Sequence, residues 1–145
     1  MEIYLFNTPQ GLKPCYDDDY DEKKKLKLGQ VYKAKITQSR NIHFHRKYFA
    51  LIRTAWEYVN ERFQRELFKD NIENFRKGVE VAAGHCDVVF NPRLKEFVDV
   101  PKSIAFDKMD ELEFQDLYER VKNVLFSTFL KNIDEDEFMS NLIDF

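Results

Sequence analysis

The sequence predicts an α+β fold in which a small sheet of short strands is packed by a long central helix and a C-terminal helical pair. Three observations lead to this fold class. Gly and Pro occur only four times each in 145 residues, which favours long regular elements over a many-turned β-sandwich. Hydrophobic residues make up 43% of the chain, with 14 Phe and 7 Tyr, enough for a core. The apolar periodicity gives the order βαβααβββαα along a single domain, residues 1–145.

The N-terminal part is expected to contain two strands and a short helix. A strand over residues 2–6 is followed by a turn-rich stretch. In residues 17–25 the acidic side chains precede the lysines, which is the order that a helix dipole favours. Residues 31–36 alternate apolar and basic side chains, a pattern typical of a half-buried strand, and Lys33 and Lys35 would lie on its outer face.

The central part is expected to hold two helices. Asn41 is a suitable N-cap, and a helical period runs from Ile42 to Leu67. Residues 71–84 form the second helix. The apolar positions of the first helix fall into two neighbouring stripes: Tyr48, Ile52, Ala55 and Val59, and then Phe49, Trp56, Phe63 and Leu67.

The C-terminal part is expected to be a hairpin followed by two helices. The hairpin strands are residues 86–90 and 96–100, joined by an Asn-Pro-Arg turn, and one more short strand follows at residues 102–106. Asp110 opens an amphipathic helix that runs to about Lys131. The remaining helix is capped by Asp134 and carries Phe138, Leu142 and Ile143.

Cysteine usage and hydropathy predict the compartment. Cys15 and Cys86 are too few for a disulfide framework or a four-sulfur metal site, and they favour a reducing compartment. We expect no signal peptide, because the N-terminus lacks a basic region followed by an apolar one. No apolar run approaches the ~20 residues of a membrane helix. The expected location is therefore cytoplasmic, with no membrane partner.

The net charge of −3 conceals a separation of charge along the chain. Residues 23–56 carry ten basic side chains and no acidic one, whereas residues 107–145 carry eleven acidic and four basic ones. A basic stretch of this kind usually faces a polyanion or an acidic protein surface. Two interpretations stay open. The stretch contacts nucleic acid, or it pairs with the acidic C-terminal helices within the chain or across a dimer.

Metal-ligating and nucleophilic residue types are present, but their spacing is unfavourable. His43 and His45 point about 200° apart at a helix start, so they do not converge on one metal ion. His85 and Cys86 are adjacent, and adjacent residues of a strand face opposite sides. Neither pair predicts a metal centre or a Cys/His nucleophile.

A magnesium-dependent nuclease motif is incomplete. Asp87 and Asp99 lie twelve residues apart around the predicted hairpin, which is a plausible start for Asp followed by Asp/Glu-x-Lys. Pro101 occupies the position of the motif's lysine, and Lys102 comes one residue late. No Gly-rich phosphate loop or zinc-hydrolase motif is present. We therefore expect a protein that is not an enzyme and has no cofactor.

The most informative constellation is the basic helix start that follows residues 31–36. Free N–H groups at a helix N-terminus attract anions, and the surrounding cations add to that attraction. Phe44 and Tyr48 could stack on unpaired bases. The alternative is that the aromatic rings are core and the cations form a solvated shoulder. The residues expected to contact nucleic acid are Lys33, Lys35, Arg40, Asn41, His43, Phe44, Arg46, Lys47 and Arg53.

Three sequence blocks resemble an uncharacterised family of bacteriophage and prophage proteins. The blocks are residues 40–51, 83–89 and 101–110, with Phe114 and the Leu117-Tyr118 pair following the third. They stand in the same order as in that family, and the match covers nearly the whole chain. The resemblance implies a phage origin. It implies no particular activity, because none is established for that family.

The first of these blocks is also similar to a helix of NinB, the lambdoid Orf recombination family. That helix reads Arg-x-x-x-x-Asn-Arg-Lys-aromatic-aromatic-Ala-Leu, and Arg46, Lys47, Tyr48 and Ala50 stand at the matching positions. His45 departs from the pattern, because the family has Asn there. Members of that family are dimeric accessory proteins that bind single-stranded DNA and help to load a recombinase. The resemblance implies the same partner and a homodimer here.

Charge and resemblance together favour a phage-derived, non-enzymatic DNA-binding accessory protein of recombination or replication in the host bacterial cytoplasm. Single-stranded DNA is the expected partner. The main alternative is a protein-interaction module, such as a phage protein that inhibits a host or defence protein through its acidic end. A structural or assembly role and a metal-dependent enzyme are the remaining alternatives.

Overall fold

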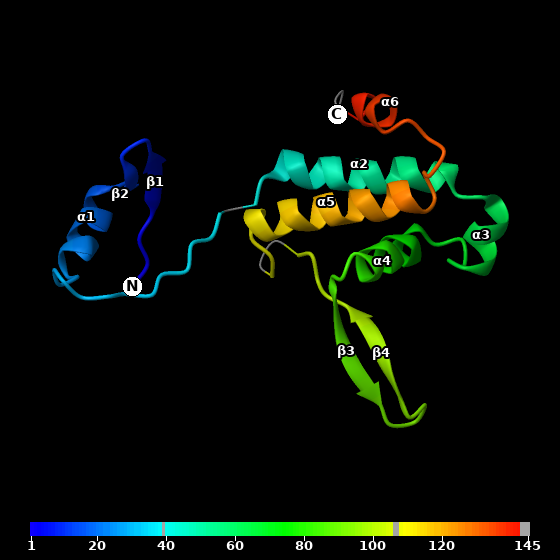
Figure 1. The fold of residues 1–145 in the computed structure, drawn as a ribbon, viewed down its shortest axis with the longest axis horizontal. Helices are drawn as coiled ribbons and strands as arrows, with labels where there is room; N and C mark the ends of the chain where they lie inside the picture. Colours follow the sequence, from blue (N-terminus) through cyan, green and yellow to red (C-terminus); the bar gives the residue numbers. More distant parts are fainter. Residues whose placement is uncertain (39, 106–107, 143–145) are drawn as a thin grey trace. The chain divides into compact units, whose positions relative to one another are not determined.

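The computed structural model describes residues 1–38, 40–105 and 108–142. The chain divides into two compact units, Met1–Ile36 and Thr37–Phe145, each considered by itself (Figure 1). Two small antiparallel sheets and six helices are present in the described ranges, so the predicted α+β class is confirmed. The expectation of a single domain stays a prediction.

The first unit is a hairpin with a helix. Strands β1 (Leu5–Thr8) and β2 (Gly11–Pro14) pair antiparallel, and Gly11 has the positive φ of 115° at the end of their tight turn. Helix α1 spans Asp17–Lys24. The buried carboxylate of Asp19 accepts the N–H of Tyr4 at 3.0 Å and the N–H of Tyr16 at 3.1 Å. This carboxylate ties the start of α1 to the residue before β1.

The strand predicted at residues 31–36 is not formed. This segment has no regular structure, and Val31 is 98% exposed. An alternating pattern makes a strand only when a second strand supplies hydrogen-bond partners, and the described sheets place none beside this segment. Lys33 and Lys35 are therefore exposed on an extended segment rather than on the face of a sheet. β2, in contrast, lies in the stretch that the sequence analysis assigned to turns.

The second unit contains five helices in its described residues: α2 (Ile42–Tyr58), α3 (Glu61–Glu66), α4 (Ile72–Ala82), α5 (Glu111–Ser127) and α6 (Glu135–Ser140). The predicted continuous helix to Leu67 is wrong. It breaks after Tyr58, because the Asn60 side chain accepts the N–H of Arg62 at 2.8 Å and starts a new helix. The break turns Phe63 and Leu67 outward, to 45% and 60% exposure.

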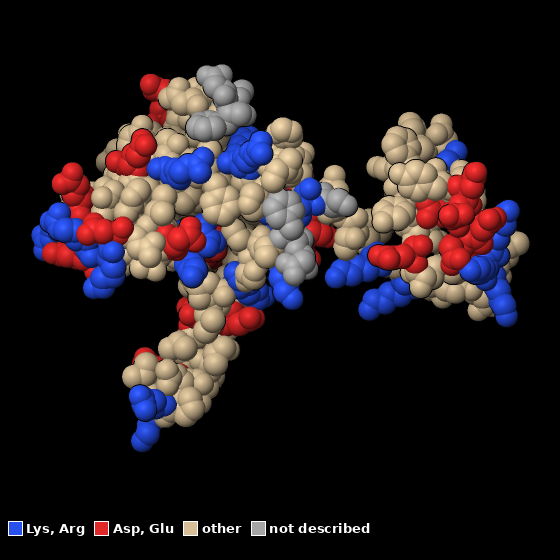
Figure 2. All heavy atoms as spheres, turned by 180° about the vertical axis from the view of Figure 1, so that it is seen from behind, with Lys and Arg blue, Asp and Glu red and all other residues tan. Residues whose placement is uncertain are grey.

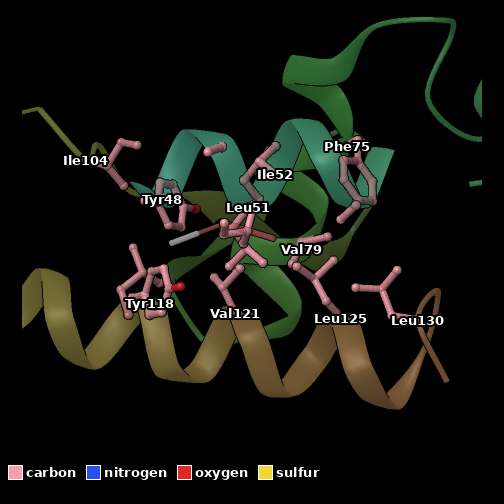
Figure 3. Close-up of a cluster of buried hydrophobic side chains, with 14 of the residues drawn as sticks. Tyr48, Leu51, Ile52, Phe75, Val79, Ile104, Tyr118, Val121, Leu125 and Leu130 are labelled. Carbon is pink, nitrogen blue, oxygen red and sulfur yellow. The ribbon is translucent and has the colours of Figure 1, made fainter. Parts of the chain in front are cut away.

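The core lies where α2, α4 and α5 meet, with α2 and α5 running side by side (Figures 1 and 3). The predicted stripe of Tyr48, Ile52, Ala55 and Val59 is confirmed, since none of these side chains is more than 4% exposed. In Figure 3, α2 and α5 point their apolar side chains toward one another. Large fully buried side chains of the three helices are Tyr48, Leu51, Ile52, Phe75, Phe114, Leu117 and Leu125.

The predicted hairpin is confirmed as strands β3 (Cys86–Asn91) and β4 (Glu96–Pro101). It projects from the helices of the second unit (Figure 1). The further strand predicted at residues 102–106 is not formed over residues 102–105, which run as irregular chain into α5. Phe106 of that prediction lies outside the described residues. So does Ile143, which was expected on the last helix.

Candidate nucleic-acid interface

The predicted N-cap is correct, and the chain itself supplies an anion at this helix start. The Asn41 side chain accepts the N–H groups of His43 at 2.9 Å and Phe44 at 3.3 Å. The N–H of Asn41 donates to Oε2 of Glu111 at 2.8 Å. Glu111 is 2% exposed, and its other oxygen accepts the Gln115 amide at 3.2 Å. A carboxylate of α5 therefore lies where the sequence analysis expected a phosphate.

Arg40 is part of the fold rather than a free cation. Its Nη1 donates to the carbonyl oxygen of Ile104 at 2.8 Å, and its Nη2 lies 2.6 Å from Nδ1 of His45. The guanidinium carbon stands 3.7 Å from the centre of the Phe114 ring. Burial lowers the pKa of Arg40, and the nearby Glu111 carboxylate opposes that shift. Arg40 thus ties the segments before α2 and α5 together.

His45 accepts rather than donates toward Arg40. Because a guanidinium can only donate, Nδ1 of His45 must be the acceptor in this contact, which requires the imidazole to be neutral at that nitrogen. Burial lowers the pKa of His45, and the positive charge of Arg40 lowers it further. The ring also packs 4.9 Å from Phe49 and 5.7 Å from Phe114.

Phe44 and Lys47 are half-buried against α5. The Phe44 ring lies 4.9 Å from Tyr118 and 5.7 Å from Phe114, measured between ring centres. The Lys47 ammonium stands 5.5 Å from the centre of the Tyr118 ring. Burial, with a smaller contribution from Glu119, raises the pKa of Tyr118 to about 12. Phe44 therefore packs against the core, as the alternative interpretation of the sequence held, and Lys47 has a packing role that the sequence did not indicate.

His43, Arg46 and Arg53 are the predicted α2 residues that remain exposed. Within the described part of the chain, neither arginine forms an ion pair. They stand seven residues apart, about two turns or ~10.5 Å along the helix, on one side of it. Figure 2 shows Lys and Arg side chains over the second unit, with Asp and Glu between them.

The cations of the first unit divide into two groups. Lys24 and Lys25 pair with Asp21 and Glu22 inside α1, as the acid-before-base order predicts. Beyond the helix, Lys33 and Lys35 are exposed and form no ion pair among the described residues of this unit. The structure thus brings Arg40, Asn41, Phe44 and Lys47 together at the α2–α5 contact. Four of the predicted cations stay open to solvent, namely Lys33, Lys35, Arg46 and Arg53.

A second candidate site is an open hollow of about 580 Å³ between the base of the hairpin and α5. Its charged lining is balanced, with Asp116 3.0 Å from Arg120 and Asp87 3.7 Å from Lys102. The buried ring of His85 lies in its wall, with Nε2 3.3 Å from the Ser103 carbonyl oxygen. Among the described residues, no three His, Cys, Asp or Glu side chains are grouped so as to hold a metal ion.

Two of the three sequence blocks that carry the phage resemblance, residues 83–89 and 101–110, meet at this hollow. The sequence pointed to His85, Asp87 and Lys102 but not to the side of α5 that faces them. Glu113, Asp116 and Arg120 follow one another at helical spacings of three and four. That spacing was readable in the sequence, although its position opposite the hairpin was not.

A buried polar network links α2 to α4. The Tyr48 hydroxyl donates to Oε1 of the fully buried Glu80 at 2.6 Å, and Nη1 of Arg76 donates to the same oxygen at 2.7 Å. Burial and the adjacent Glu80 carboxylate raise the pKa of Tyr48 well above its usual range. This network orients α4 on α2 and does not reach the exposed cations.

Sequence comparison identifies the family but not an activity. A family model described as "Protein of unknown function (DUF1367)" matches residues 7–65 and 59–145. The chain belongs to this family. No curated protein and no solved structure matches the chain significantly. Membership of DUF1367 confirms the expectation of an uncharacterised family. None of the helices in the described ranges has the length and apolar character needed to cross a membrane.

Proposed function

We propose that this DUF1367 protein is a phage-derived, non-enzymatic accessory protein of recombination or replication that binds single-stranded DNA in the host cytoplasm. One observation carries the proposal. The acid-free stretch of residues 23–56 leaves Lys33, Lys35, Arg46 and Arg53 exposed and without ion pairs among the described residues. Cations that are not in an ion pair can bind phosphates directly, because no carboxylate has to be displaced first.

The expected contacts are with the phosphate backbone. Arg40, Asn41 and Phe44 hold the start of α2, so we do not expect them to contact phosphates or bases. Contacts of exposed lysine and arginine side chains with phosphates do not depend on the base sequence. Binding should therefore be similar for oligonucleotides of different sequence and should weaken steeply with salt.

The likeness to the NinB recombination family supports a DNA contact at the exposed cations of α2. Arg46 and Lys47 stand at the basic positions of that pattern, and Arg46 is exposed while Tyr48 and Ala50 are buried. The arginine of the pattern that matches Arg46 is therefore exposed here, and the aromatic and small residues that match Tyr48 and Ala50 lie in the core.

Variants of the exposed cations test the proposal. Retention of single-stranded, duplex and branched oligonucleotides should be compared for the wild type and the double variant Arg46→Ala/Arg53→Ala at two salt concentrations. Each lost phosphate contact lowers the slope of log affinity against log salt by about 0.7 for single strands. The matched control is Arg62→Ala, because Arg62 is an exposed helical arginine that pairs with Glu66 at 3.1 Å. If Arg46→Ala/Arg53→Ala and the control Arg62→Ala bind single-stranded DNA with the same affinity, the assignment of Arg46 and Arg53 to the DNA contact is wrong.

A protein-interaction module is the second candidate, and the exposed hairpin favours it. Phe97 is 71% exposed and Val88 is 64% exposed, although both belong to regular strands. Exposed apolar side chains gathered on one element are typical of a protein-binding surface. Stoichiometric capture of a host protein, together with no retention of any oligonucleotide, would favour this function over DNA binding.

A further inference from the structure

The β3–β4 hairpin exposes apolar side chains on both faces. Val88 and Phe90 share one face with Phe97, and Val89 shares the other with Val100; all five are between 42% and 71% exposed. Figure 2 shows mostly uncharged side chains along the projecting hairpin between its base and its tip. A two-stranded hairpin is marginal by itself and needs further strands or a packed face for stability. The described part of the chain places no third strand beside it.

The hydrogen-bond pattern shows which backbone groups face outward. The N–H of Lys102 donates to the His85 carbonyl at 3.3 Å, so these two form a hydrogen-bonded pair. Opposite residues of an antiparallel ladder alternate between bonded and non-bonded pairs. Cys86, Val88 and Phe90 therefore belong to non-bonded pairs, and their N–H and C=O groups point away from β4.

The two edges of the hairpin differ in how well they are protected against pairing with another strand. The corresponding outward residues of β4 are Phe97, Asp99 and Pro101, of which one is charged and one has no N–H. Charges and proline are the devices that keep an edge strand from pairing. The outward residues of β3 carry neither device. β3 is thus an open edge with intact donors and acceptors.

We propose that β3 pairs with β3 of a second copy of this chain, making a two-fold symmetric, four-stranded antiparallel sheet. With Val89 on the axis, Val88 lies opposite the partner's Phe90 and Asp87 lies opposite the partner's Asn91. Apolar side chains then meet apolar ones, and no like charges oppose each other.

The side chains of β3 beside the open edge are exposed and available to a partner strand. Val88, Val89 and Phe90 are 64%, 47% and 49% exposed. Phe97 and Val100 belong to β4, two strand spacings from the partner's β3, so they lie outside this contact. This inference is independent of the DNA-binding proposal and differs from the charge-based dimer contact expected from the sequence.

Proline variants on the two edges test the proposal. Val88→Pro removes one outward N–H from β3, and the matched control Asp99→Pro removes the opposite outward N–H from β4. Light scattering at tens of micromolar should show twice the 17.5 kDa chain mass for the wild type and Asp99→Pro, and a single chain mass for Val88→Pro. A monomeric wild type, or a dimeric Val88→Pro, overturns the proposal.

Cross-linking decides the matter if a proline variant fails to fold. In a Cys15→Ser/Cys86→Ser background, Val89→Cys places two thiols opposite each other at the axis and should give a disulfide-linked dimer. The control Val98→Cys shares the face but lies three strand spacings, ~14 Å, from its symmetry mate and should not cross-link. Equal cross-linking of the two variants, or none, overturns the proposal. The proposal is also overturned if the hairpin amides become protected from hydrogen exchange only after a host protein or an oligonucleotide is added.

Discussion

Replacing Glu111 with alanine should destabilise the start of α2. The carboxylate is 2% exposed and accepts the N–H of Asn41 at 2.8 Å and the Gln115 amide at 3.2 Å. Hydrogen bonds to a charged group contribute about 1.5–3 kcal/mol, and a negative charge at a helix N-terminus adds about 0.3–1 kcal/mol. The charge of Arg40 would also lose its nearby counter-charge. We expect Glu111→Ala to lower the free energy of unfolding by about 2–4 kcal/mol.

Urea denaturation followed by circular dichroism measures this loss. With a urea dependence of about 2 kcal/mol per molar, the midpoint should fall by about 1–2 M. Glu113→Ala is the matched control, because Glu113 lies in the same helical turn but is exposed, and its loss should change stability by less than about 0.5 kcal/mol. Glu111→Gln keeps an acceptor oxygen and should fall between the two. If Glu111→Ala matches the control, this carboxylate does not hold the helix start, and the N-terminus of α2 would be open to an external anion after all.

Three further outcomes are expected. Tyr48→Phe should cost about 1–3 kcal/mol of unfolding free energy in urea denaturation, because it leaves an oxygen of the buried Glu80 without its hydroxyl donor. The free energy of unfolding should fall as the pH drops below about 6.5, because the pKa of His45 is lowered in the folded state and protonation breaks its acceptor contact with Arg40. His45→Gln should flatten this pH dependence when urea midpoints are measured from pH 7.5 to 5.5. Trp56→Ala should cost about 3 kcal/mol by the same assay, because the half-buried indole packs on two phenylalanine rings, and a negligible loss would contradict the assigned helix phase.

Helix starts and the buried face of α2 were predictable from the sequence because both depend on near neighbours. Asn41, Asp110 and Asp134 each accept an N–H two or three residues onward, so the residue type and its position are enough. The buried stripe from Tyr48 to Val59 follows from helical periodicity alone. The break before α3 also had a local signal in the sequence, because Asn60 is a typical N-cap residue. The apolar period that continues to Leu67 nevertheless favoured one unbroken helix.

Long-range partners decided the features that the sequence did not predict. Residues 31–36 have the pattern of a strand, but a strand needs a hydrogen-bonding neighbour, and pattern alone does not supply one. Arg40 and Asn41 were expected to face a phosphate. Their partners, Ile104 and Glu111, lie 64 and 70 residues further along the chain, so the composition of the basic segment gave no sign of them. The exposed cations Arg46 and Arg53 were predictable, because helical spacing places them opposite the buried stripe.

The salt dependence of single-stranded DNA binding tests the central claim most directly. Four exposed cations, each releasing ~0.7 counterions from a single strand, predict a slope of log affinity against log salt of about −2 to −3. The wild-type chain should show this slope by fluorescence anisotropy with oligonucleotides of unrelated sequence, and the affinities should be similar among them. Failure to retain any oligonucleotide at low salt, or binding that does not change with salt, would contradict the account.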